Sequence, residues 1–466
     1  MTQWECNPSY GLGRTMAFDS RGKSPRAGSA RGADTTGKTN PGAAEDNGLT
    51  GNPFSDDPDD QSFSSVSSNG PRADLFDKCD LDTRADELAA RGLYPFFIPI
   101  EGSEGTVVRI EGEKKIMLGS NNYLGLTHDP RVLARAEEVA RRYGTGCTGS
   151  RFLNGTLDLH ERLETDLAAL VRKEKALVFS TGFQVNLSVL STLIGRNDTV
   201  IIDKLDHASI VDGCHLAAGE TLRFRHNDMA DLERVLKKAS EHPGGKMVVV
   251  DGIFSMEGDV CDLPNVVRLA KQFGAKVMVD EAHSIGVMGK TGAGVAEHFG
   301  LQADVDLVMG TFSKSFASIG GFVAGDRRVV DFIKHNGRPM IFSAALPPYA
   351  VATVQACLDI LKAEPERREQ LWRNADYLKR GIQRLGFDTG PCDSPVIPVI
   401  IGRMLDTFYF WKELLKAGVF TNPVIPPAVP ENTARLRTSV MATHTEELLA
   451  EALEIFEQVG KKVGVI

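Results

Sequence analysis

The pattern that most limits the fold of this chain is a series of short apolar runs separated by amphipathic stretches, which begins near Leu75. Several runs are continuously apolar and rich in Val and Ile, as expected for strands whose two faces are both covered. Strands that alternate with helices in this way are typical of a parallel α/β sheet. The expected strands are residues 176–179, 199–203, 221–225, 247–251, 276–280, 307–311 and 321–324.

Helix start signals lie between these runs. Asp129 and Pro130 supply an N-cap and a proline at the first helical position. Asp158, with Glu161 three residues later, predicts a capping box at the start of a second helix. The later part of the chain predicts an α+β layer, with helices at 348–361, 367–385 and 406–416, strands at 396–401 and 435–440, and a closing helix.

Composition divides the chain into four parts. Residues 1–72 are rich in Gly, Ser, Asn, Asp and Pro and have few residues able to form a core, which predicts a disordered tail. The many glycines and the lack of an amphipathic period favour a plain tail over an organelle-targeting peptide. We expect a segment 73–120 that packs with the small domain, a large cofactor-binding domain 121–364, and a small domain 365–466.

Charge and cysteine usage exclude several classes of function. The formal net charge of −9, from 53 Lys and Arg against 62 Asp and Glu, argues against a protein that coats nucleic acid. The seven cysteines are scattered without a C-x-x-C pair, which fits neither a disulfide framework nor a zinc site and indicates a reducing compartment. No apolar run is long enough to span a bilayer or to form a secretory signal. We therefore expect a cytoplasmic protein without a transmembrane segment, which acts on small molecules or proteins.

The apolar run at 276–280 ends in Asp280, and His283 follows three residues later. Ligands in open parallel sheets bind at the carboxyl ends of the strands, so both side chains are expected near a bound cofactor. An acid at this position also commonly caps the next turn. The residues themselves leave both interpretations open.

Lys314 follows the run at 307–311, in the stretch 310–315 (GTFSKS), and Gly320 and Gly321 come shortly after it. An amine in this setting suits attachment to a carbonyl cofactor, whose phosphate the neighbouring hydroxyl groups would hold. The alternative is an ordinary surface lysine, because most lysines are exposed.

Two further stretches follow predicted strands. Residues 179–186 (FSTGFQVN) form a small-residue turn into a helix, and the N–H groups of such a turn suit a phosphate. His207 follows the strand at 199–203 and is either a cofactor contact or a satisfied core histidine. Residues 289–291 (GKT) end like a P-loop, but Ser284 stands where that pattern needs glycine, and no histidines have the H-E-x-x-H spacing of a zinc enzyme.

In their order along the chain, the phosphate turn, His207, the Asp280 and His283 pair, and Lys314 resemble the fold-type I pyridoxal phosphate (PLP) enzymes. More specifically, they are similar to the α-oxoamine synthase family, which condenses an amino acid with an acyl-CoA thioester and releases CO₂. The resemblance covers about residues 85–466 and implies a mostly parallel seven-stranded sheet with helices on both faces, followed by a C-terminal α+β small domain. Further matching stretches are 120–126 (SNNYLGL), 144–156 (GTGCTGSRFLNGT), 280–286 (DEAHSIG) and 342–348 (FSAALPP).

The resemblance implies a role for each residue around the cofactor ring. Lys314 would bind PLP as a Schiff base and then act as the base at the substrate Cα. Asp280 would pair with the pyridine nitrogen and keep it protonated. His207 would stack on the ring face, and His283 would reach the phenolic oxygen.

The resemblance also implies a phosphate site and a substrate site. The phosphate would be bound by Gly182, Phe183, Thr311 and Ser313, with Ser343 contributed by the second subunit of a homodimer. Many family members have Tyr at position 183, so Phe183 lacks one hydroxyl group. The substrate carboxylate would be bound by Arg437, with Tyr123 and Asn122 close by. No residue is expected to bind a metal.

The Ser313-Lys314-Ser315 motif and the stretch 223–227 (RFRHN) resemble the soluble bacterial serine palmitoyltransferases of this family. They imply that L-serine and a long-chain acyl-CoA, palmitoyl-CoA, condense to 3-ketodihydrosphingosine, CoA and CO₂ in the first step of sphingolipid synthesis. One alternative is a relative that uses glycine, alanine or an acyl carrier protein thioester. Another is a non-catalytic scaffold subunit of the same fold, which would be expected to lack Lys314.

Overall fold

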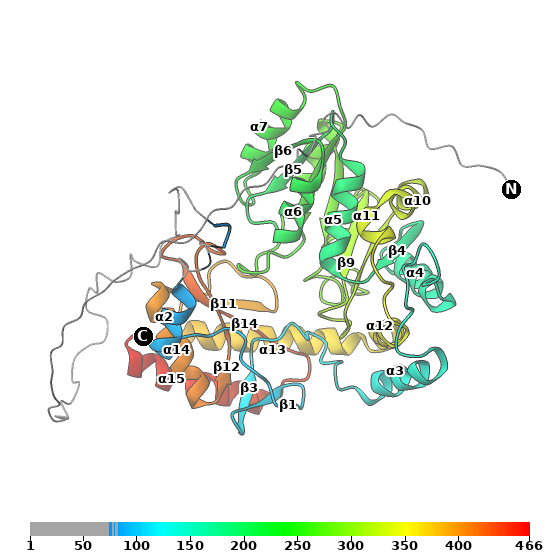
Figure 1. Ribbon diagram of the computed structural model, residues 1–466. Coiled ribbons are helices and arrows are strands. Elements are labelled where there is room, and N and C mark those ends of the chain that lie inside the picture. Colours follow the sequence, from blue (N-terminus) through cyan, green and yellow to red (C-terminus); the bar gives the residue numbers. More distant parts are fainter. Residues whose placement is uncertain (1–73, 77–78, 80–82) are drawn as a thin grey trace, which may run out of the picture. The chain divides into compact units, whose positions relative to one another are not determined.

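The computed structural model describes residues 74–76, 79 and 83–466, all within one compact unit, Asn52–Ile466 (Figure 1). The predicted disordered tail, residues 1–72, lies outside the described residues. The first described helix is α2, Arg84–Ala90.

The central sheet has seven strands in the order β4-β10-β9-β8-β7-β5-β6. Only β10 runs antiparallel to its neighbours β4 and β9, so the predicted mostly parallel seven-stranded sheet is confirmed. Each expected strand forms within about one residue of its predicted bounds. These strands are β4 Lys175–Phe179, β5 Thr199–Asp203, β6 Glu220–Phe224, β7 Lys246–Asp251, β8 Lys276–Asp280, β9 Leu307–Thr311 and β10 Gly321–Gly325.

Successive residues of these strands contribute to two different apolar clusters, because side chains alternate between the faces of a sheet. Val248 and Val250 of β7 belong to one cluster, and Met247 and Val249 belong to the other. Both clusters include helix residues, so both faces are covered, as predicted (Figure 1). The helices up to the end of this region are α3 Pro130–Tyr143, α4 Asp158–Leu170, α5 Gly182–Leu193, α6 Ala208–Leu216, α7 Met229–Ala239, α8 Leu263–Gln272, α9 Val295–His298, α10 Arg327–Asn336, α11 Arg338–Ile341 and α12 Pro348–Ala363.

The two predicted helix starts have different outcomes. Asp129 caps α3 by accepting a hydrogen bond from the Arg131 amide, as predicted. The predicted capping box of Asp158 and Glu161 is wrong, because α4 begins with Asp158 inside the helix and Leu157 at the N-cap. The buried imidazole of His160 accepts the Leu157 amide at 3.1 Å and so replaces the carboxylate that the pattern suggested.

The later part of the chain forms the predicted α+β layer. Its elements are α13 Pro365–Arg384, β11 Val396–Gly402, α14 Met404–Ala417, β12 Val419–Phe420, β13 Asn422–Val424, β14 Ala434–Ser439 and α15 Glu446–Val463. Three strands form an antiparallel sheet in the order β11-β14-β13. A second small sheet joins β12 to three earlier strands, β1 Gly102–Ser103, β2 Val107–Ile110 and β3 Glu113–Met117. The domain boundaries at 120 and 364 stay a prediction.

A buried ion pair connects the 144–156 stretch to the central sheet. Arg151 Nη1 lies 2.8 Å from Glu164 Oε1, and the two side chains are 4% and 10% exposed. The same oxygen accepts the Val178 amide of β4 at 2.9 Å, and Arg151 Nε donates to Thr156. Removing one charge of a buried pair leaves the other without compensation, which costs more than the pair itself contributes.

We therefore expect Glu164→Gln to destabilise the protein by about 3–5 kcal/mol, because Arg151 would remain charged and buried. The matched control is Glu137→Gln, whose pair with Arg141 is 64% and 78% exposed and should cost only about 0–1 kcal/mol. Urea unfolding of the two variants and the parent protein measures the difference. Equal losses in both variants would contradict this account of the buried pair.

Candidate active site

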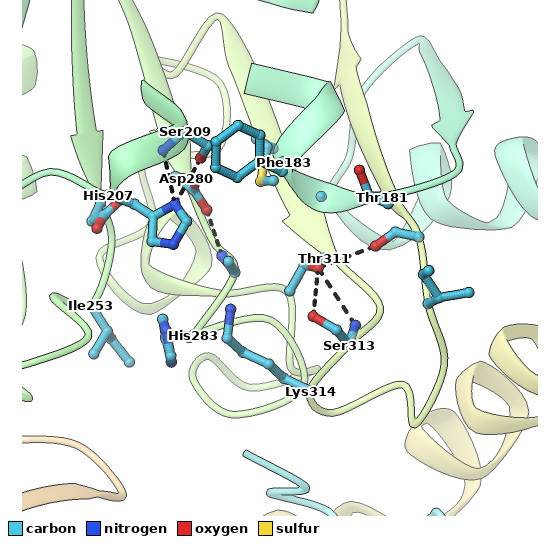
Figure 2. A pocket seen from close by; sticks show the side chains of 16 residues that line it. Thr181, Phe183, His207, Ser209, Ile253, Asp280, His283, Thr311, Ser313 and Lys314 are labelled. Carbon is cyan, nitrogen blue, oxygen red and sulfur yellow. Dashed lines mark hydrogen bonds between the residues drawn. The ribbon is translucent and has the colours of Figure 1, made fainter. Parts of the chain in front are cut away.

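A cavity of about 340 Å³ lies at the carboxyl ends of β8 and β9 and at the start of α5 (Figure 2). This volume is within the range of about 300–1,000 Å³ that is usual for small-molecule sites. Widely separated parts of the sequence contribute to its wall. Eight of the predicted site residues line it, namely Gly182, Phe183, His207, Asp280, His283, Thr311, Ser313 and Lys314.

Asp280 ends β8 and is 4% exposed. Its Oδ2 accepts Asn186 Nδ2 of α5 at 2.8 Å, and its Oδ1 accepts the Ala282 amide at 2.9 Å. Both interpretations of this acid therefore hold, because the side chain lines the cavity and also caps the turn that follows it. Two hydrogen bonds fix the direction of the carboxylate before any ligand binds.

Lys314 extends into the cavity and is not an ordinary surface lysine (Figure 2). Burial lowers the pKa of its amine to about 8, and the positive charge of Arg437 acts in the same direction. The carboxyl groups of Asp280 and Asp251 partly oppose this shift. A minority of the amine, but far more than in an ordinary lysine, is therefore neutral near physiological pH, and the neutral form is the one that a nucleophile or a base requires.

His207 is both a capping residue and a cavity residue. Its Nδ1 accepts the Ser209 amide at 3.2 Å and lies 2.7 Å from the Ser209 hydroxyl, at the start of α6. Its ring meets that of Phe183 edge-on, with 6.3 Å between the centroids. Burial lowers the pKa of His207, with Lys314 adding to the shift and Asp280 opposing it. A neutral aromatic ring is thus held in the wall of the cavity.

His283 shares a hydrogen bond of 2.8 Å between its Nδ1 and the Tyr123 hydroxyl. Both residues are buried, and burial holds the pKa of His283 well below its usual value, with Lys314 and Arg437 acting in the same direction. Tyr123 does not line the cavity itself. It orients the imidazole that does, so it contacts the site through His283.

The remaining predicted residues lie outside the cavity wall. Arg437 is 5% exposed, its Nε donates to the Ser255 carbonyl at 2.6 Å, and its Nη2 has no partner among the described residues. Asn122 accepts the Leu126 amide and donates to Thr127, so its polar groups are satisfied locally. Ser343 accepts a hydrogen bond from Gln184 Nε2 of the same chain at 2.9 Å.

Asp251 is a cavity residue that the sequence analysis did not single out. It ends β7, pairs in register with Asp280 on β8, and is 5% exposed with no partner for its Oδ1 among the described residues. Burial, with Asp280 and Asp206 adding to it, holds the pKa of Asp251 well above its usual value, which favours the protonated acid. An apolar run ending in Asp was the signal used for Asp280, and 247–251 carries the same signal.

The cavity residues fit PLP. The first turn of α5 offers unpaired backbone N–H groups, and a Cβ at Gly182 would lie 2.6 Å from Thr311 Oγ1, so only glycine leaves this turn open to a phosphate. The Lys314 amine suits the cofactor aldehyde, and the Asp280 carboxylate suits a protonated ring nitrogen. Within the described residues no group of three His, Cys, Asp or Glu side chains could hold a metal ion.

Comparison with known proteins agrees with this geometry. The aminotransferase class I and II family matches residues 113–456. Serine palmitoyltransferase from Sphingobacterium spiritivorum is 49% identical over 380 residues, which are 82% of this chain and 95% of that protein. The 8-amino-7-oxononanoate synthase from Thermoanaerobacter pseudethanolicus is 42% identical over 383 residues, 82% of this chain and 97% of that protein.

Among solved structures, serine palmitoyltransferase from S. paucimobilis with a bound PLP-myriocin aldimine has a TM-score of 0.82. It is 40% identical, and the match covers 84% of this chain and 100% of that one. The resemblance stated from the sequence motifs is confirmed, and the chain belongs to the aminotransferase class I and II family and, within it, to the α-oxoamine synthases.

Proposed function

We propose that this chain is a PLP-dependent serine palmitoyltransferase that condenses L-serine with palmitoyl-CoA to 3-ketodihydrosphingosine, the first step of sphingolipid synthesis. The observation that carries this proposal is the Lys314 amine beside the Asp280 carboxylate in one cavity. Support also comes from relatives that are named serine palmitoyltransferase and from the PLP in the S. paucimobilis structure. In the reaction, serine Cα loses its carboxylate as CO₂ and bonds the acyl carbon, while the thioester C–S bond breaks and CoA leaves as a thiol.

When bound, PLP supplies an electron sink for the carbanion that develops at the substrate Cα. Lys314 would hold the cofactor through its amino group and, once the substrate amine has displaced it, remove the Cα proton. Asp280 would keep a proton on the ring nitrogen, since a carboxylate nearby favours the cationic ring. The neutral His207 would lie against the ring face, and the neutral His283, held by Tyr123, would bond the phenolic oxygen.

The phosphate would bind at the start of α5 and at the end of β9. The Gly182 and Phe183 amides, the Thr311 hydroxyl and the Ser313 hydroxyl surround that end of the cavity, with 3.0 Å between the two hydroxyl oxygens. Phe183 contributes only its amide, because it lacks the hydroxyl group of the tyrosine found in many family members.

Arg437 would bind the serine carboxylate. Its Nε is already used by the Ser255 carbonyl, and the buried Nη2 without a partner supports a ligand at the other side of the guanidinium. Tyr123 and Asn122 would lie on the substrate side of the site.

We also propose a homodimer with shared sites and a cytoplasmic location. Ser343 lies next to Phe342, whose side chain is 74% exposed, and this exposure supports an interface through which Ser343 would reach a partner's phosphate site. The free cysteines among the described residues support a reducing compartment. No helix in the described part of the chain is both long and apolar enough to cross a membrane.

The first test is substrate choice. We expect L-serine with palmitoyl-CoA to give 3-ketodihydrosphingosine faster than any other pair, and shorter acyl chains to react more slowly, since each buried methylene contributes about 0.8 kcal/mol. Product formation and CO₂ release are measured with serine, glycine and alanine in turn, and with palmitoyl-CoA, acetyl-CoA and an acyl carrier protein thioester. Faster turnover of glycine or alanine would favour the other α-oxoamine synthase activities, to which the 42% identical relative belongs.

The second test is the lysine. Lys314→Ala should lower the rate of CoA release by at least about 10²–10⁴-fold, because the cofactor attachment and the base at Cα are lost together. Lys290→Ala is the matched control, since Lys290 is exposed and lies outside the cavity. Retained turnover in Lys314→Ala would contradict the catalytic role, and a parent protein that neither binds PLP nor turns over substrate would favour the scaffold alternative.

The third test is pH. Only the neutral amine attacks an aldehyde, and the pKa of Lys314 is lowered to about 8. The rate at which cofactor-free protein takes up added PLP should therefore rise about tenfold per pH unit below this value and level off above it. Absorbance after mixing measures this rate.

Asp280→Asn should shift the midpoint of this pH dependence to lower pH, because the Asp280 carboxylate favours the ammonium form of Lys314. A midpoint near the ordinary lysine value would contradict the assignment.

A further inference from the structure

The stretch 223–227, singled out in the sequence, contains a histidine, His226, that the mechanism does not use. His226 lies between two carboxylates, with Nδ1 3.0 Å from Asp203 Oδ1 and Nε2 3.0 Å from Asp259 Oδ2. Asp203 ends β5, whereas Asp259 belongs to the loop between β7 and α8, residues 252–262. One imidazole therefore connects a strand end of the central sheet to a loop that is distant in sequence.

Asn227 strengthens the same connection. Its amide donates to Asp203 Oδ2 at 2.8 Å, and its Nδ2 donates to the Val260 carbonyl at 3.1 Å. Its Oδ1 accepts the Asp262 amide at 3.0 Å. Its φ is 51°, a left-handed conformation that asparagine adopts more readily than most residues. The two adjacent residues together hold the C-terminal part of the 252–262 loop, at Asp259, Val260 and Asp262, and we call them the His226–Asn227 clasp.

The other side of this loop meets β14. Arg437 Nε donates to the Ser255 carbonyl at 2.6 Å, and Arg435 Nη1 lies 3.3 Å from the Met256 carbonyl and 3.5 Å from Glu257. Phe254 is fully buried, and its ring meets that of His226 edge-on at 4.5 Å. The loop is therefore held by the clasp on one side and by two arginines on the other.

We propose that His226 is a positioning residue, which holds the 252–262 loop so that Arg437 is aimed at the substrate carboxylate. This inference rests on the proposed function, because it takes Arg437 as the carboxylate-binding group. The connection runs from His226 through Asp259 to the loop, and from the Ser255 carbonyl to the guanidinium. His226 does not line the cavity, so its effect on the site passes through the 252–262 loop, which also carries the cavity residue Ile253.

The carboxylates around His226 favour the charged form of its imidazole. Burial opposes the charged imidazole, but the carboxylates of Asp203 and Asp259 outweigh it and raise the pKa of His226 to about 10. Glu257 of the same loop also faces this charge, and its own carboxylate is paired with Arg435 of β14. At physiological pH the charged imidazole of His226 thus lies between the buried carboxylates of Asp203 and Asp259. A neutral side chain at position 226 would leave these two carboxylates to repel each other.

The test measures steady-state kinetics of three PLP-bound proteins, namely the parent enzyme, His226→Gln and the matched control His242→Gln. The imidazole of His242 is half exposed and pairs with Glu220. We expect His226→Gln to raise the KM for L-serine about tenfold, with kcat and the KM for palmitoyl-CoA within about twofold, because a loss of binding alone leaves kcat unchanged. His242→Gln should change none of the three. Equal losses in kcat and in both KM values would indicate a merely structural role and overturn the proposal.

Hydrogen exchange without substrates gives a readout independent of activity. In His226→Gln the amides of residues 252–262 should exchange faster than in the parent protein, whichever amino acid the enzyme uses. Unchanged exchange would overturn the clasp. If exchange is faster in His226→Gln but the parent protein does not use serine, the role of His226 in holding the loop is supported and the proposed function is contradicted.

A double variant tests the charge pairing and covers the case in which His226→Gln folds poorly. Asp259→Asn added to His226→Gln removes one of the two unpaired carboxylates, so the double variant should be easier to obtain in soluble form and should regain part of the serine affinity. A serine KM in the double variant that equals or exceeds the product of the two single effects would overturn the ionic account.

Discussion

Three neighbouring strands, β5, β7 and β8, each end in a buried aspartate, and the arrangement of the site depends on how these carboxyl groups are compensated. Asp203, Asp251 and Asp280 lie at adjacent carboxyl ends of a parallel sheet, where burial and mutual repulsion both disfavour three negative charges. Each carboxyl group has a different environment. Asp203 pairs with His226, burial raises the pKa of Asp251, and Asp280 accepts two hydrogen bonds and faces the Lys314 amine.

The division of roles has a chemical consequence. Because the pKa of Asp251 is raised and Asp203 is paired with His226, Asp280 is the carboxyl group best placed to carry a negative charge toward a ligand in the cavity. Asp206 contributes to the same arrangement. Its carboxyl group accepts hydrogen bonds from the Asp203 and Asp251 amides. Burial holds the pKa of Asp206 well above its usual value, and Asp203 adds to the shift. The raised pKa values of Asp206 and Asp251 therefore favour protonated acids beside the Asp280 carboxyl group.

The sequence predicted those features that follow from periodicity and from local chemistry. The seven strands were found because their apolar runs are short and clearly bounded, and the cavity residues were found because they follow strand ends. The antiparallel direction of β10 was not predictable from its run, since an apolar pattern carries no direction. The start of α4 was predicted to within one residue, but its capping box was assigned to the wrong residues, because the acceptor is His160, a residue type that is rarely counted as a capping partner. Long-range contacts such as Tyr123 to His283 could not be read from spacing, because 160 positions separate the two residues.

The direction of Arg437, the proposed carboxylate-binding residue, depends on contacts from several elements. The guanidinium of Arg437 is carried by β14, but its direction is set by the Ser255 carbonyl of the 252–262 loop, and the loop is anchored through Asp259 to His226 after β6. Lys314 and Asp280, in contrast, follow and end strands β9 and β8 of the central sheet, and Asn186 of α5 also holds the Asp280 carboxylate. In the proposed function, the contacts that fix the amine and this carboxylate therefore differ from those that direct Arg437. On this proposal, a change at the loop alters how tightly the substrate carboxylate is bound more than it alters the positions of Lys314 and Asp280.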